Sequence, residues 1–300
     1  MLKDFEMICH HFPKNEDITI LPVSDVHLGA AEHMQRAWEL FCQGVLEKPN
    51  TYITLGGDLI NNATKSSVSS VYDETMRPSE QKRLMAKMLE PLAKEGRILC
   101  AVPGNHERRS LKDADDEPMY DIMTKLDIEH LYRPTTAYMK IQIGDTEGNG
   151  YYNPTYCLAV NHGAGGGALT GSSVNRAERF GYAVDGLDCL ILGHTHKPVQ
   201  SQPGKIKVDA HNKRISIKPF KVVISSSWLS YGGYAAEKLL LPPPMPHRKL
   251  SSAETGKPSN SPWRMRDQYG LYNQRSTVLA KIMKGRKQHG FQGKGNGKDG

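Results

Sequence analysis

The chain has little cysteine and no long apolar run, and these two absences exclude several classes of protein. Its cysteines are scattered, odd in number and without CxxC spacing: Cys9, Cys42, Cys100, Cys157 and Cys189. This pattern predicts no disulfide framework, as is typical of a reducing compartment. No apolar stretch approaches the roughly 18 residues of a membrane span, and the start MLKDFEMICHHFPKNED lacks the apolar core of a secretory signal. We therefore expect a cytoplasmic protein that does not bind membranes.

Acidic residues are scarce at the C-terminal end, and the net charge of +7 comes from that end alone. Residues 241–300 carry a net charge of +9, which leaves −2 for residues 1–240. The stretch opens on four prolines and is poor in apolar residues, which predicts a Pro-rich connection and a mostly disordered basic tail, with a short helix at 274–283. Residues 1–240 are the predicted domain. Two roles for the tail stay open: nucleic-acid binding through phosphate contacts, or solubilisation and partner docking.

Helix and strand patterns alternate through the predicted domain. Apolar residues between Met34 and Val45 recur at steps of four, three and four, as on one face of a helix. A second helix is expected after Ser79 as its N-cap, kinked or shortened at Pro91 and stopped by Gly96. This order predicts an α/β fold with two packed sheets and outer helices. Further helices are expected at 118–126 and 174–180, and strands at 52–55, 98–102, 139–143 and 205–225.

Five short apolar runs each end in residue types that bind metals. Runs of this kind, bounded by Gly or Pro, are typical of buried strands, and sites in sheets wound with helices form at the carboxyl ends of the strands. We therefore expect the terminal residues to converge, with enough ligands for two metal ions. The runs and their ends are ILPVSDVH (Asp25, His27), YITLGGD (Asp58), ILCAVPGNH (Asn105, His106), CLAVNH (His162) and CLILGHTH (His194, His196).

The residue types suggest separate tasks in such a centre. Asp58 is the natural bridge between two ions because a carboxylate offers two oxygens. Asp25 and His27 have one residue between them, so on an extended strand end both side chains are expected on one side, and the last two histidines repeat this spacing. Asn105 adds an amide oxygen and His162 an imidazole. Nitrogen and oxygen donors without thiolate favour Mn, Fe, Zn, Ni or Co over Ca or Mg. Of these metals, Mn is the one we expect in the centre.

The ordered set of blocks resembles the calcineurin-like metallophosphoesterases, whose pattern is DxH…GD…GNH[DE]…H…GHxH. All five blocks stand in this order over residues 18–198. Any single block is a weak signal, but the ordered set is specific. Many members have GDxxD, whereas this chain has Asn61 at the last position, which should alter the tuning of the centre without loss of metal. The resemblance implies an αββα sandwich of two mixed β-sheets flanked by helices.

The resemblance also implies how the metals and the reaction are organised. The activity it implies is hydrolysis of phosphate mono- or diesters by a hydroxide that bridges two divalent ions. The glycine-rich segment after His162 resembles phage and bacterial members, and for a phage protein the compartment would be the host cytoplasm. Two alternatives stay open, a DNA or RNA nuclease of the same superfamily and a non-catalytic binding module on this fold. One implied ligand set is Asp25, His27, Asp58 and His196, and the other is Asp58, Asn105, His162 and His194.

His106 and Asp58 are the predicted catalytic residues. His106 is not needed as a ligand, and imidazole has a suitable pKa to protonate a leaving alkoxide or to steady the phosphate. Arg108 and Arg109 could contact the substrate phosphate, or could be a solvated or ion-paired surface pair. The glycine run at 163–167 could form a backbone nest for phosphate or a flexible turn. The residues predict a reaction class, and the substrate depends on the segments between them.

Overall fold

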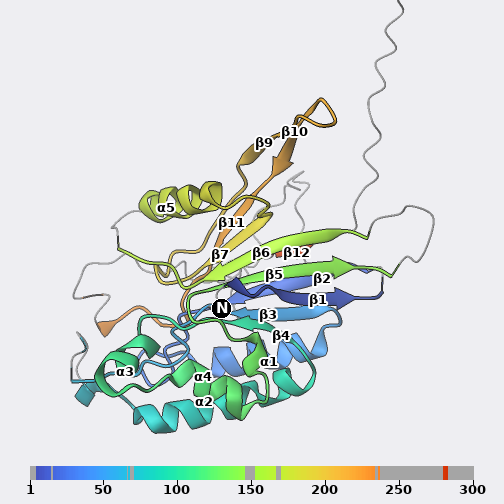
Figure 1. Ribbon diagram of the computed structural model, residues 1–300. Helices are drawn as coiled ribbons and strands as arrows, with labels where there is room; N and C mark the ends of the chain where they lie inside the picture. The colour runs from blue at the N-terminus through green and yellow to red at the C-terminus, as the bar shows by residue number, and fades with distance from the viewer. Residues whose placement is uncertain are drawn as a thin grey trace, which may run out of the picture.

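The computed structural model describes residues 5–14, 16–65, 67, 71–145, 153–166, 170–233, 236 and 280–282, the last three as backbone only. Two mixed sheets form the centre of the molecule (Figure 1). The larger sheet has six strands, in the order β1 (Ile8–Phe12), β5 (Thr136–Ile143), β6 (Thr155–Asn161), β7 (Cys189–Leu192), β11 (Lys221–Ile224) and β8 (Val199–Ser201). The smaller sheet has four, in the order β12 (Ala280–Ile282), β2 (Ile18–Val23), β3 (Thr51–Leu55) and β4 (Ile98–Ala101).

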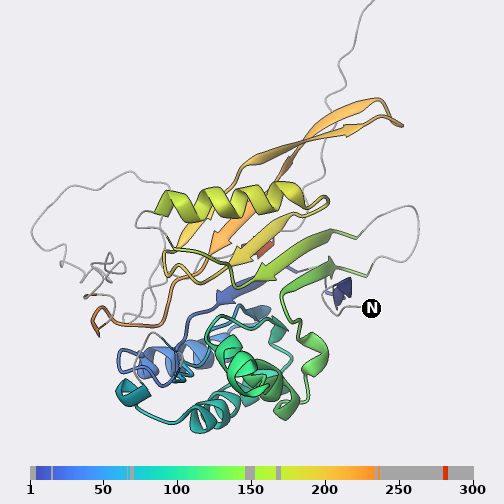
Figure 2. The ribbon, with the colours of Figure 1, turned by 60° about the vertical axis from the view of Figure 1, so that its left-hand side comes forward.

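The two sheets pack face to face, with helices on both outer sides (Figure 2). Between the sheets, side chains such as Ile20 and Cys100 meet Met139 and Val160 from the larger sheet, all fully buried. The outer face of the smaller sheet is covered by α1 (Gln35–Glu47), α2 (Pro78–Lys94) and α4 (Pro118–Lys125). Helix α5 (Thr170–Ala183) covers β6, β7 and β11. The predicted αββα sandwich is confirmed.

Sequence patterns explain most element boundaries. The predicted apolar face of α1 buries Trp38 and Val45. Helix α2 begins at Pro78, whose fixed φ suits the first turn. Its N-cap residue is Arg77, so the predicted cap at Ser79 is wrong by two positions. Pro91 lies inside the helix and does not end it, and the chain turns at Gly96 with a φ of 61°.

Other boundaries differ from the predictions. Residues 205–225 do contain an antiparallel pair, β9 (Gly204–Asp209) and β10 (Arg214–Pro219), but β11 runs parallel to β7. The predicted helix at 274–283 is wrong where the structure describes it, because residues 280–282 form strand β12 antiparallel to β2. The separate basic tail stays a prediction, since the rest of 241–300 lies outside the described residues. Within the described residues, no helix is both long enough and apolar enough to cross a membrane.

Strand β1 and helix α3 (Glu107–Ala114) were not predicted. Strand β1 joins the larger sheet beside β5, although its sequence ICHHF breaks the apolar pattern with two histidines. Helix α3 begins directly after the GNH block, and its sequence ERRSLKDA has too few apolar residues to show a helical face. Short 3₁₀ turns stand at Val71–Asp73 and Glu129–Leu131.

Candidate metal centre

The loops that follow β2, β3, β4, β6 and β7 meet at one edge of the sandwich. Strands β2, β3 and β4 are parallel, as are β6 and β7, so the loops after each set leave their sheet at the same end. The Asp25 amide donates to Gly57 O at 3.0 Å, which joins the loops after β2 and β3. The His194 amide donates to Asp25 Oδ2 at 2.9 Å and joins the two sheets. Convergence of the five strand ends therefore follows from the topology.

Five of the predicted ligands lie in the left-handed region of backbone conformation. Their φ angles are 54° at Asp25, 50° at His27, 52° at Asp58, 68° at His194 and 56° at His196. The prediction that the DxH and HxH pairs continue an extended strand is therefore wrong. The side chains of Asp25 and His27 do lie close together, whereas His194 and His196 join different ligand groups. Left-handed conformation at a non-glycine residue costs roughly 1–2 kcal/mol, and such strain clusters at functional sites.

Glycines beside the ligands allow the loops to approach one another. A Cβ at Gly57 would lie 2.3 Å from the Gly104 amide nitrogen, and a Cβ at Gly104 would lie 2.5 Å from the amide nitrogen of Asp58. A Cβ at Gly193 would meet the side chains of Ser24 and Asp25. The glycine of each GD, GNH and GHxH block is thus required by close packing between loops.

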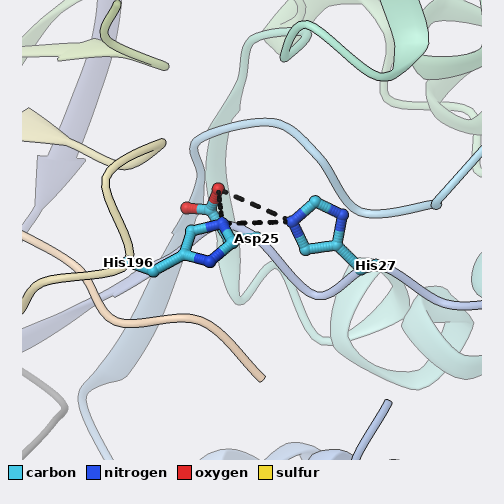
Figure 3. A group of neighbouring side chains, drawn as sticks. All are labelled: Asp25, His27 and His196. Carbon is cyan, nitrogen blue, oxygen red and sulfur yellow. Dashed lines mark hydrogen bonds and ion pairs between the residues drawn. The ribbon is translucent and has the colours of Figure 1, made fainter. Parts of the chain in front are cut away.

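The first ligand group consists of Asp25, His27 and His196, which point toward one another (Figure 3). His196 Nε2 lies 3.1 Å from Asp25 Oδ1 and 3.3 Å from His27 Nε2. His27 Nε2 is 3.9 Å from the same carboxylate oxygen. Asp25 Oδ1 is buried with no well-aligned hydrogen-bond donor, so its lone pairs are left for a cation.

The second group consists of Asp58, His162 and His194, with Asn105 beside them. Asn105 Oδ1 lies 3.0 Å from His162 Nε2 and 2.8 Å from His194 Nδ1. His162 Nε2 is also 3.2 Å from Asp58 Oδ2. Two imidazoles, one amide oxygen and one carboxylate therefore lie close together. His162 is oriented by a 2.8 Å hydrogen bond from Nδ1 to Gly56 O.

Asp58 connects the two groups. Ligand atoms of His27, Asp58 and His106 lie within 4.8 Å of one another, between the first and second groups. Asp58 Oδ1 accepts a 2.8 Å hydrogen bond from the His106 amide, which orients the carboxylate. Oδ2 is the oxygen that faces His162 and, at 3.8 Å, His106 Nε2.

The electrostatics of the site favour ionised carboxylates and an added positive charge. Burial alone would raise the pKa of Asp58, but His162 and His106 hold it well below its usual range. Asp25 has a pKa of about 2, because nearby His196 outweighs burial. Burial alone would lower the pKa of His162, but the negative charge of Asp58 raises the pKa of His162 to about 10. Burial holds the pKa of His27 well below its usual value, so this imidazole is neutral and can act as a ligand.

Glu107 supports the site and was given no role from the sequence. Its side chain is 1% exposed. Oε2 accepts hydrogen bonds from the amides of Asp58 at 2.9 Å and Gly104 at 2.8 Å, while Oε1 accepts from Leu59 at 2.7 Å and Ile60 at 3.3 Å. The available signal was its place directly after GNH. One buried carboxylate thus ties the loop after β3 to the loop after β4.

His106 and Arg109 form a pair at the edge of the two ligand groups. His106 Nδ1 donates to Asn61 O at 2.7 Å, so the neutral ring carries no proton on Nε2. Arg109 Nη2 donates to that Nε2 at 3.0 Å. Arg108 is turned away, and its Nη2 donates to Pro134 O at 2.7 Å. The structure therefore brings Arg109 to the site and leaves Arg108 outside it.

Asn61 and the glycine run take defined positions. Asn61 Nδ2 donates to Glu74 Oε1 at 2.9 Å, so the side chain of Asn61 lies beside a carboxylate. The Gly163 amide is held by Asn161 Oδ1 at 2.7 Å. Arg176 on α5 donates to Ala164 O, and Gly167 lies outside the described residues.

The donor set fits divalent metal ions. The two buried carboxylates, the amide oxygen and the four imidazoles of the two groups contain no thiolate. Mixed nitrogen and oxygen ligands of this kind suit first-row divalent ions.

The calcineurin-like phosphoesterase model matches residues 18–198, more than half of the chain. The chain belongs to the calcineurin-like phosphoesterase family. A curated relative, the DNA polymerase II small subunit of Archaeoglobus fulgidus, is 25% identical over 152 residues. That match covers 43% of this chain and only 28% of the relative, so the chain spans less than a third of that protein.

Two solved structures are similar to this chain. One is an uncharacterized protein and predicted phosphoesterase of Streptococcus pneumoniae TIGR4, with 13% identity, a TM-score of 0.30 and coverage of 73% of this chain and 77% of that one. The other is a metallophosphoesterase of Sphaerobacter thermophilus, with 17% identity, a TM-score of 0.32 and coverage of 72% and 80%.

Proposed function

We propose that the protein hydrolyses phosphate mono- or diesters at a centre of two divalent metal ions. The observation that carries this proposal is the arrangement of two buried ligand groups with Asp58 Oδ2 between them. One ion would be held by Asp25, His27, His196 and Asp58, and the other by Asp58, Asn105, His162 and His194. Two such ions supply an activated water and neutralise charge on the phosphoryl oxygens.

The residues of the chain would bind the phosphate and move a proton. Arg109 lies beside His106, and a guanidinium matches two phosphate oxygens, so Arg109 is the proposed phosphate contact. A phosphate that draws Arg109 onto its own oxygens frees His106 Nε2. The negative charge of the phosphate then favours a proton on this nitrogen, which His106 can give to the leaving alkoxide. The bond from Nδ1 to Asn61 O keeps the ring oriented through both states.

Asp58→Asn tests the proposal directly, with Asp185→Asn on an exposed loop as the matched control. We expect two ions per chain by elemental analysis after loading with Mn in the wild type and the control, and one or none in Asp58→Asn. Hydrolysis of an aryl phosphodiester should fall by a factor on the order of 10³ in Asp58→Asn alone. Full activity of that variant, or a wild type that binds no metal at saturating Mn, would contradict the proposal. A metal-loaded wild type without turnover on any ester would favour the non-catalytic binding module.

A nuclease is the second candidate, and one comparison favours it. The curated relative is a subunit of a DNA polymerase, and residues 241–300 of this chain are strongly basic. A panel of mono-, di- and polynucleotide esters with Mn separates a nuclease from a phosphomonoesterase.

DNA binding through the tail needs a full-length variant, because truncation at 240 would remove strand β12. The variant replaces the basic residues of 241–300 other than Lys281 with glutamine. A tail that holds DNA by phosphate contacts should lose affinity on this change, most strongly at low salt. Equal affinity of the variant and the wild type at low salt would remove the tail from DNA binding.

A further inference from the structure

The hairpin β9–β10 carries an apolar face that points into solvent. It projects past the end of the larger sheet in both ribbon views (Figures 1 and 2). In its register, Ile206 stands opposite Ile217 and Val208 opposite Ile215, so the four side chains form a two-by-two grid on one face. They are 67–75% exposed. We call this grid the aliphatic patch.

The polar face of the same hairpin is turned toward the body of the protein. Lys205 Nζ donates to Gly181 O and, at 3.1 Å, to Val184 O, and it lies 4.3 Å from the ring centroid of Phe220. Lys218, opposite Lys205 in the register, has its Nζ 3.9 Å from an Asp188 oxygen. A strand in a stable sheet buries its apolar face, whereas this hairpin buries part of its polar face and exposes the aliphatic one.

A contiguous apolar patch of this kind marks an interaction site. A two-stranded hairpin is marginally stable alone and gains from a third or fourth strand packed on its apolar face. The four side chains of the aliphatic patch are uncharged and β-branched, so the surface that complements them best is another flat aliphatic surface. The cations of the hairpin lie on the opposite face and would not meet across such a contact.

We propose that two copies of the chain associate through their aliphatic patches, hairpin against hairpin. Complete burial of the four side chains would remove at most roughly 500 Å² from each copy, or about 1,000 Å² in total, the size of a weak, transient interface. The dimer is therefore weak and reversible, with a dissociation constant on the order of micromolar. Its cationic faces stay free on the outside of the pair.

Sedimentation equilibrium of the full chain, from about 5 to about 200 µM, tests the proposal. The wild type should rise with concentration from 33.4 kDa toward twice that mass. Ile206→Ser with Ile217→Ser should weaken association by about tenfold or more. The control, Lys207→Gln with Ser216→Ala, changes a cross-strand pair on the opposite face and should leave association unchanged.

A second measurement serves if the serine variant does not fold. Hydrogen exchange of wild-type amides at 206–217 should slow as concentration rises. A wild type whose mass stays at 33.4 kDa over the whole concentration range overturns the proposal. This holds also if the hairpin of that monomer binds lipid vesicles or another protein. Equal association of wild type and serine variant, or exchange at 206–217 that does not depend on concentration, overturns it as well.

Discussion

Replacement of Glu107 by glutamine tests whether a residue that does not bind metal stabilises the metal centre. Glu107 is not a predicted ligand, yet its two oxygens accept four buried amide hydrogen bonds from the loops that carry Asp58 and Asn105. Glutamine has the same shape, but one oxygen becomes an NH₂ group that cannot accept. Whichever oxygen is replaced, two of the four buried amides lose their acceptor.

The size of the effect follows from those two amides. A buried donor without a partner costs roughly 1–3 kcal/mol, so the free energy of unfolding should fall by about 2–4 kcal/mol after some relaxation. The same loss frees the loop that holds Asp58, and the loss of such supporting contacts lowers metal affinity by about 10–100-fold. Both effects should therefore appear together in Glu107→Gln.

Urea unfolding followed by tryptophan fluorescence measures the stability, and titration calorimetry with Mn measures the affinity. Glu39→Gln is the matched control, because Glu39 pairs with Arg36 at 3.3 Å on an exposed helix face and should contribute less than about 0.5 kcal/mol. A Glu107→Gln protein with wild-type stability and wild-type Mn affinity would refute the assigned role.

Further predictions concern helix packing and the proton donor. Gly181→Ala should lower the free energy of unfolding by about 1–3 kcal/mol, because the added Cβ would lie 2.1 Å from the Phe220 ring. A Cβ at Gly44 would meet no atom within 4 Å, so Gly44→Ala should raise the free energy of unfolding by about 0.5–1 kcal/mol. Equal unfolding midpoints for the two variants would contradict this. Burial and the charge of Arg109 lower the pKa of His106, so Arg109→Gln should raise it and move the basic limb of the kcat–pH profile to higher pH. A limb that stays or moves to lower pH would show that His106 is not the acid.

The local sequence predicts elements well where one pattern dominates. The steps between Met34 and Val45 predict α1, and the apolar runs before Asp58 and Asn105 predict β3 and β4. Helix α3 was missed because it buries only a narrow face, and β12 because its pairing with β2 depends on chain more than 250 residues away. Long-range pairing overrides local preference in such segments.

The sequence by itself determined which residue types meet, because the order of strands places five strand ends at one edge of the sandwich. Tertiary structure decided how they meet. Asp25 and His194 have left-handed backbone, and hydrogen bonds between loops hold their amides. The orientation of the Asp58 carboxylate depends on the amide of His106. The different positions of Arg108 and Arg109 likewise follow from the start of α3, since adjacent residues on a helix point about 100° apart. Motifs specify the donors, whereas contacts between distant segments specify their direction.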